Sequence, residues 1–265
     1  MPRPTPLAGP IARARTDALR LRGWRGEIAL FLGAYVLYGI ARWVCIGDVR
    51  VATANAHAIA RLEDGLSLDL EAGVQRALDG SAALWVLNHL YLAAQLVVVP
   101  VVLAWLYRCS RPTYQRLRNT VLATWLISVP VYAVFPVAPP RLAGVGLVDT
   151  ITTQTGFALD GRLTTAFYNP LAAVPSLHAG FAIAVSAALA ASLRGRGART
   201  AAWLWAPLIA LAVVATGNHF VFDIAAGAVA TGAGFLVGEA LARRTRRFAP
   251  REDAAPVPAP SPAAG

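Results

Sequence analysis

The chain alternates between long apolar runs and short polar segments. Six of the runs approach the roughly 20 mostly apolar residues that a helix needs to cross a bilayer. They cover residues 27–46, 82–107, 121–135, 174–193, 201–215 and 220–242. The third and fifth runs are short, and the third can extend backward into Leu117. The pattern predicts an all-α, polytopic membrane protein with a bundle of six transmembrane helices.

The first apolar run is preceded by arginines and followed by small residues, as in a signal peptide. Its apolar region is longer than the roughly 7–15 residues of a cleaved signal, so we expect an uncleaved anchor. The chain then divides into an arginine-rich segment at 1–26, a transmembrane domain at 27–248 and a tail at 249–265. The tail is too poor in large apolar residues to fold, which predicts disorder.

A different periodicity follows the first run. In the segment 54–78, apolar residues recur every four positions: Leu62, Leu66, Leu70, Val74 and Leu78. This spacing predicts an amphipathic helix, which Gly65 and Gly73 weaken, so two short external helices are expected. The pattern fits two placements equally well, one lying on the membrane surface and one forming a soluble cap.

Composition supports the membrane assignment. Hydrophobic residues make up 57% of the chain and charged residues 14%, whereas soluble domains have about 25% charged residues. The net charge of +10 comes with 24 basic residues, all arginine, that lie in short blocks between the apolar runs. No basic face with interleaved aromatic residues is visible, which argues against a nucleic-acid partner. The lipid bilayer is the expected partner.

The arginines also predict the orientation, because cytoplasmic loops carry an excess of positive charge. Most of them lie before the first run, after the last run, or in the connections that follow the second and fourth runs. The segment 47–81 instead has six carboxylates against three arginines. We therefore expect both termini in the cytoplasm of a multi-pass protein of the inner (plasma) membrane.

This topology brings three short clusters to the external face, at residues 135–141, 173–178 and 217–223. In the third cluster, His219 and Asp223 are four residues apart and share one face of a helix. A carboxylate that accepts from one imidazole nitrogen fixes the tautomer and leaves the other nitrogen as a nucleophile or base. A buried structural pair would show the same spacing.

The other two clusters supply groups for an anion. Pro175 suits the first turn of a helix, where the free N–H groups and the Ser176 hydroxyl form an anion site. His178 follows within reach as a proton donor. Arg141 comes after a proline pair, and its planar guanidinium matches two phosphate oxygens. Taken separately, His178 fits an interfacial histidine, and Arg141 fits a side chain reaching the lipid headgroups. Together with the His–Asp pair, these groups suit phosphoryl transfer through a phosphohistidine.

At these residues the chain resembles the type 2 phosphatidic acid phosphatase superfamily, and most closely its inositol phosphorylceramide synthase-like branch. The matching motifs are Ala-Pro-Pro-Arg ending at Arg141, Pro-Ser-Leu-His ending at His178, and His219 with Asp223 followed by Gly227. The resemblance implies no metal and no cofactor. It implies these roles: His219 as nucleophile, Asp223 as its partner, His178 as general acid, and Arg141 with Ser176 as phosphate ligands.

The chain departs from the broad superfamily at its cation positions. Val134 stands where the superfamily has lysine, and Ala212 and Val213 stand where it has Ser-Arg. Leu142 and Leu177 replace a proline and a glycine of the usual motifs. The missing cations resemble the synthase-like branch. Arg162 and His89 are candidate substitutes, although a solvated loop arginine and a helix-packing imidazole explain them as well.

The sequence thus predicts an integral membrane lipid phosphatase or phosphotransferase that acts on a lipid phosphate at the external face. The acceptor would be water or an alcohol such as inositol. One alternative is a synthase-like transferase that moves a phospho-alcohol headgroup between lipids. Another is a non-catalytic lipid-binding or transport protein on the same fold.

Overall fold

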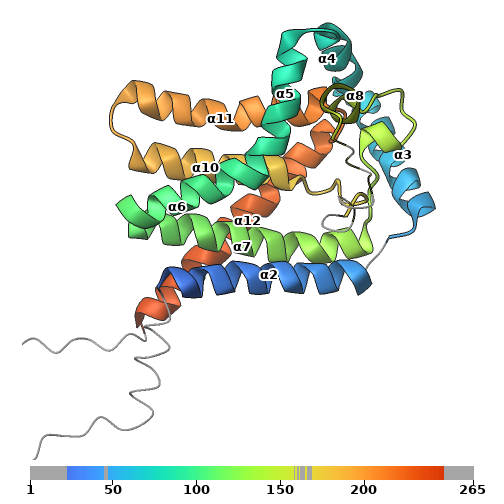
Figure 1. Cartoon of the computed structure of the whole chain (residues 1–265). Helices are drawn as coiled ribbons and strands as arrows, with labels where there is room; N and C mark the ends of the chain where they lie inside the picture. The colour runs from blue at the N-terminus through green and yellow to red at the C-terminus, as the bar shows by residue number, and fades with distance from the viewer. Residues whose placement is uncertain are drawn as a thin grey trace, which may run out of the picture.

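The computed structural model describes residues 23–44, 47–157, 159, 161, 165 and 169–247. In these residues all the regular elements are helical, as expected, and Val137 and Ala172 form an isolated bridge. In chain order the helices are α2 (Trp24–Val44), α3 (Val49–Gly65), α4 (Glu71–Leu78), α5 (Ala82–Ala93), the π-helical η1 (Ala94–Val98), α6 (Val99–Cys109), α7 (Arg111–Val134), the 3₁₀ turn η2 (Pro140–Leu142), α8 (Thr150–Thr155), α10 (Leu177–Ser192), α11 (Arg196–Ala215) and α12 (Val221–Arg247) (Figure 1). The tail at 249–265 and nearly all of the segment 1–26 lie outside the described residues.

The long helices form one bundle. In Figure 1, α2 lies beside α7, and α10 and α11 form an antiparallel pair, while α12 packs against both α7 and α10. Four helices are long and apolar enough to cross a membrane, which indicates a membrane protein: Ala82–Cys109, Arg111–Val134, Arg196–Ala215 and Val221–Arg243. The count of six stays a prediction, because α10 has only 16 residues and the last side chains of α2 lie outside the described residues.

The helix Ala82–Cys109 bends in its middle (Figure 1). Pro100 has no backbone N–H to donate to the preceding turn, and the residues just before it, Ala94–Val98, adopt the wider π geometry. The bend lets α5 pack on α11 while α6 packs on α7 and α10. This places the residues of α5 near the beginning of α10.

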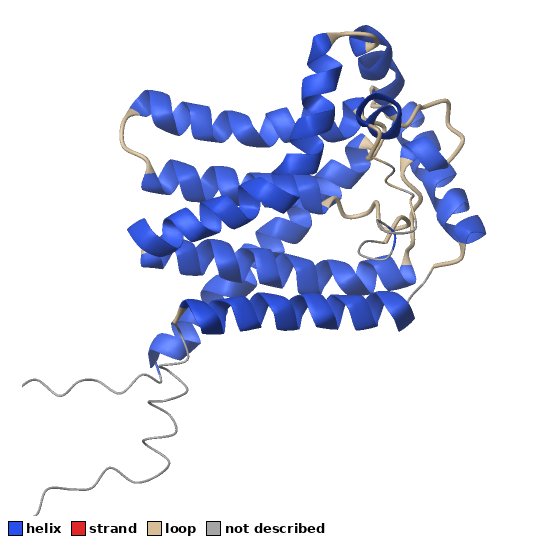
Figure 2. Cartoon of the chain, in the orientation of Figure 1, coloured by secondary structure: helices blue, strands red, loops and turns tan. Residues whose placement is uncertain are grey.

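The two ends of the bundle differ in character. The arginine-bearing connections α6–α7 and α10–α11 lie at one end, together with the start of α2 and the end of α12. The opposite end carries α3, α4, α8 and the starts of α10 and α12, and Figure 2 shows that most of the irregular chain gathers there. The predicted site clusters belong to this second end.

The segment after α2 forms two short helices, α3 and α4, separated by residues 66–70. Leu62, Leu66 and Leu70 face outward and are about half exposed. The side of α3 that packs inward instead carries small and polar residues, among them Ala56 and Glu63. These three leucines therefore do not hold the segment on the bundle, whereas Val74 and Leu78 of the same stripe pack against its buried clusters.

Glycines allow the closest helix contacts near the site. A Cβ added at Gly227 of α12 would collide with the carbonyl oxygen of Ser176, just before α10. A Cβ at Gly234 would collide with the Thr124 hydroxyl of α7. Small residues let neighbouring backbones approach each other in this way in membrane bundles. The start of α10 is thus held directly against the first two turns of α12.

Candidate active site

Four side chains from distant parts of the chain meet at one end of the bundle. His178 lies in the first turn of α10, Asp223 in the first turn of α12, and His219 in the turn between α11 and α12. Arg141 belongs to the 3₁₀ turn η2, whose backbone is joined to this turn by a hydrogen bond from Arg141 N to Gly217 O of 2.9 Å. The ring centroids of His178 and His219 are 6.0 Å apart.

The His219–Asp223 pair is buried and directly bonded. His219 Nδ1 lies 3.1 Å from Asp223 Oδ2, which also accepts the N–H of Phe220 at 3.0 Å. Asp223 is fully buried and His219 is 6% exposed. The carboxylate assigns the Nδ1–H tautomer and leaves Nε2 with its lone pair. A histidine held in this way can act as a nucleophile or as a base.

The local chain folds so that His219 sits in a fixed turn. Gly217 has a positive φ of 70°, which a glycine adopts without steric cost. The backbone N–H groups of Asn218 and His219 both donate to the carbonyl of Val213, in the last turns of α11. The turn is therefore tied to the end of one helix while Asp223 ties its histidine to the next.

The environment of His219 keeps its imidazole neutral. Burial lowers the pKa of His219 to about 3, the backbone carbonyl of Ala173 opposes this by favouring the protonated ring, and the Arg141 guanidinium lowers the pKa further. A protonated imidazole has no lone pair to attack phosphorus. The low pKa therefore leaves a lone pair on the ring at neutral pH.

His178 is placed by an aromatic residue that the sequence did not suggest. Its ring stacks on Tyr91 of α5, with centroids 4.2 Å apart and an interplanar angle of 19°. Tyr91 is 7% exposed. Stacking on a fixed aromatic ring restricts the imidazole to one plane on the side of the site that faces His219. An aromatic residue within an apolar run gave no signal for this role.

The start of α10 differs from the prediction in one respect. Ser176 is the N-cap residue, and its Oγ accepts the N–H of Ala179 at 3.3 Å, so Pro175 lies before the helix and not in its first turn. The placement of Pro175 in the first turn was wrong because the serine is the better cap. The Ser176 N–H donates to the carbonyl of Asp223 at 3.0 Å. Ser176 is fully buried beside the pair.

Arg141 is held by two side chains that the sequence analysis missed. Its Nε donates to Asn218 Oδ1 at 2.9 Å, and its Nη1 lies 3.3 Å from Asp149 Oδ2. Asp149 is also the N-cap of α8, where it accepts the N–H of Thr152 at 3.0 Å. The only available signals were the Asp-Thr pair typical of a helix start and the polar residue directly before His219.

The residues at the positions where the superfamily has Lys and Ser-Arg are either exposed or surrounded by apolar side chains. Val134 is 82% exposed at the end of α7, and Ala212 and Val213 are fully buried in apolar clusters. His89 is exposed, and its Nδ1 lies 2.8 Å from the carbonyl oxygen of Trp85 in its own helix. Arg162 lies outside the described residues. Among the described residues, none of the His, Cys, Asp and Glu side chains form a group of three or more that could hold a metal.

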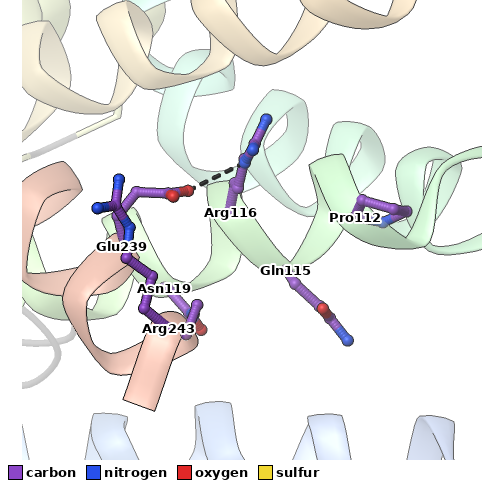
Figure 3. Close-up of a pocket in the computed structure, with 7 residues that line it drawn as sticks. Pro112, Gln115, Arg116, Asn119, Glu239 and Arg243 are labelled. Carbon is purple, nitrogen blue, oxygen red and sulfur yellow. Dashed lines mark ion pairs between the residues drawn. The ribbon is translucent and has the colours of Figure 1, made fainter. Parts of the chain in front are cut away.

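A separate cavity of about 240 Å³ opens at the arginine-rich end, between α7 and α12 (Figure 3). It contains an ion pair between Arg116 Nε and Glu239 Oε1 at 2.9 Å. Its lining residues are Pro112, Gln115, Arg116, Asn119, Glu239, Ala242 and Arg243. None of them belongs to the histidine site.

Fold and site together define a helical membrane protein with a buried histidine–aspartate pair, a second histidine and an arginine at one end of the bundle. The family model of the PAP2 superfamily matches residues 57–237, a range that contains all four side chains. The chain therefore belongs to the PAP2 superfamily, whose members are generally phosphatases or phosphotransferases. No curated protein and no solved structure matches it.

Proposed function

We propose that the chain is an integral membrane lipid phosphatase or phosphotransferase that works through a phosphohistidine on His219. The observation that carries this proposal is the meeting of His219, already bonded to Asp223, with His178 at a ring distance of 6.0 Å. The buried Arg141 guanidinium beside His219 supplies the positive charge for the phosphate oxygens.

The reaction follows from these positions in two steps. His219 Nε2 attacks phosphorus, and the bond from phosphorus to the lipid oxygen breaks. The negative charge of the bound phosphate favours the protonated form of His178, which donates its proton to that oxygen. Asp223 stabilises the positive charge that develops on the His219 ring. Water or an alcohol then attacks the phosphohistidine and gives its proton to His178. The N–P bond breaks, and His219 is again neutral.

The substrate is proposed to be a lipid phosphate that enters sideways from the external leaflet. The site and the outward-facing leucines of α3 and the α3–α4 connection lie at the end of the bundle opposite to the arginine-bearing connections. An excess of arginine marks the cytoplasmic side. The same argument supports cytoplasmic termini and the inner (plasma) membrane as the location.

A second candidate is the transfer of a phospho-alcohol headgroup between lipids, as in the synthase-like branch. Two observations favour it: apolar residues stand at the cation positions Val134 and Val213, and Arg141 is already paired with Asp149. A phosphate monoester carries up to two negative charges, whereas a phosphodiester carries one. A site with so little excess positive charge suits the diester better.

The experiment uses purified protein in lipid micelles with ³²P-labelled lipid phosphate, with and without inositol. Wild-type protein should give an acid-labile, alkali-stable labelled protein, while His219→Ala should abolish both the label and turnover without loss of fold. Release of free phosphate identifies a phosphatase, and a new labelled phosphodiester identifies a transferase. Unchanged turnover in His219→Ala refutes the mechanism, and tight lipid binding without any label supports the non-catalytic alternative.

A further inference from the structure

Three carboxyl groups surround the first turn of α12. The backbone N–H groups of Phe220, Val221 and Phe222 have no partners within the helix itself, because they open it. Asp223 Oδ2 accepts the first at 3.0 Å, Glu71 Oε1 accepts the second at 2.8 Å, and Glu63 Oε1 accepts the third at 2.6 Å. Each of the three acceptors comes from a different helix.

Glu63 and Glu71 are the surprising members of this set. Glu63 belongs to α3 and Glu71 to the first turn of α4, and both are nearly fully buried, at 2% and 4% exposed. Neither faces an arginine among the contacts that the structure shows for it; each faces a backbone N–H of α12 and the other acid. A buried carboxyl group is retained only when its charge is neutralised or its oxygens are hydrogen-bonded.

The surroundings of Glu63 favour its neutral form. Burial raises the pKa of Glu63 to about 8, with the Phe222 N–H opposing and the carboxyl groups of Glu71 and Asp223 adding to the rise. These two carboxyls, one from α4 and one from α12, are the titratable groups that face Glu63 among the described residues. Glu63 and Glu71 are within hydrogen-bonding reach of each other. A proton on Glu63 removes the repulsion that two carboxylates would feel.

We propose that Glu63 and Glu71 are positioning residues of the active site: they bind the first N–H groups of α12 and hold its start so that Asp223 orients His219. This inference deepens the proposed function and rests on it. The distances leave little freedom, since both acids bind N–H groups within two residues of Asp223. A shift of the first turn of α12 moves the aspartate and, through its 3.1 Å bond, the imidazole.

The effect belongs to the chemical step rather than to binding. A displacement of about 1 Å at a reacting group costs roughly 100-fold in rate. Glu63→Ala and Glu71→Ala should therefore lower kcat by roughly 10- to 100-fold, with KM changed less than about threefold. Glu63→Gln keeps an acceptor oxygen for Phe222 and an N–H donor toward Glu71, so it should retain most of the wild-type kcat at pH 7.

The proton on Glu63 predicts a pH dependence with a definite sign. Below about pH 8 Glu63 keeps its proton and the cap is intact. Above that pH the proton is lost, two buried carboxylates repel each other, and kcat should fall. Glu63→Gln has no proton to lose, so its kcat profile should lack this alkaline fall or shift it upward.

Two controls separate this role from a purely structural one. Asp64→Ala removes the adjacent, exposed carboxyl of the same helix and should leave kcat unchanged. Hydrogen exchange of the Val221 and Phe222 amides, measured by mass spectrometry without substrate, should speed up in Glu63→Ala and stay slow in Glu63→Gln and Asp64→Ala. If the two acids served only the stability of the fold, their substitution would lower the thermal stability without changing kcat or its pH dependence.

The following results would overturn the positioning role of Glu63 and Glu71 or the proposed function. Glu63→Ala that folds and keeps kcat within twofold of wild type overturns the proposal, as does Glu63→Gln with an unchanged alkaline limb. If Glu63→Ala does not fold, the pH profile of Glu63→Gln decides alone. If His219→Ala is active, the proposed function fails, and the exchange rates still report whether the two acids hold the start of α12.

Discussion

The contact between Gly227 and Ser176 allows a sharp test of how closely the site depends on helix packing. A Cβ at position 227 would collide with the Ser176 carbonyl oxygen, and the next nearest atoms are also Ser176 backbone, which cannot rotate away. To reach an ordinary contact of 3.4 Å or more, α10 and α12 must separate by about 1 Å. That separation also stretches the bond between Ser176 N and Asp223 O, now 3.0 Å.

Gly227→Ala should therefore affect both stability and rate. Overpacking of this kind costs about 1–3 kcal/mol, and a 1 Å displacement of the His178 helix relative to the His219–Asp223 pair costs roughly 100-fold in kcat. Gly232→Ala is the matched control, because position 232 of the same helix has no atom within 4 Å of an added Cβ. That control should gain roughly 0.5–1 kcal/mol in helix stability and keep its activity.

The assay compares kcat for phosphate release and the thermal midpoint of the two variants in the same detergent. A fall in kcat confined to Gly227→Ala supports a site that the α10–α12 contact holds in register. Equal activity of the two alanine variants refutes the reasoning, because the helices would then separate without disturbing the site.

Three further predictions concern single side chains. Asp223→Asn should lower kcat by roughly 10³- to 10⁴-fold, because the amide no longer fixes the tautomer or stabilises the charged ring; a labelled phosphohistidine that still forms at the wild-type rate would contradict this. Asp149→Asn should raise the ratio of kcat/KM for a monoester to kcat/KM for a diester by roughly two- to fivefold, because the Arg141 guanidinium loses its partly exposed carboxylate partner. An unchanged ratio would argue against a role for Asp149 in the choice between the two substrates. Tyr91→Leu should lower kcat by roughly 2- to 10-fold through loss of the stack on His178; in single-turnover measurements the defect should appear in release of the leaving group, and normal kinetics there would rule out the stack as a positioning contact.

Much of the fold could be predicted from the sequence because the membrane imposes a simple pattern. Apolar runs of sufficient length, with arginine between alternate pairs, predict both the long helices and which of their ends lie together. The three motifs could be placed at one end for the same reason. The predicted pair of short helices after the first run is also present, as α3 and α4.

The parts that could not be predicted depend on contacts between distant segments. Glu63 and Glu71 looked like surface charges in an acidic loop, and only the packing of α3 and α4 shows them buried against α12. Periodicity favoured the leucines as the significant face of this segment, yet Leu66 is 60% exposed. Likewise, nothing local in the sequence links Tyr91 to His178 or Asp149 to Arg141.

The bonds from α3 and α4 to α12 have a consequence for how the chain is assembled. Glu71 meets a partner 150 residues later in the chain, and Glu63 one 159 residues later. Until the last helix has been synthesised and inserted, both acids lack the N–H groups that they bind in the finished protein. The site therefore matures only when the final helix docks, and a fragment that begins after α4 contains all three motifs but lacks two of the groups that surround the start of α12.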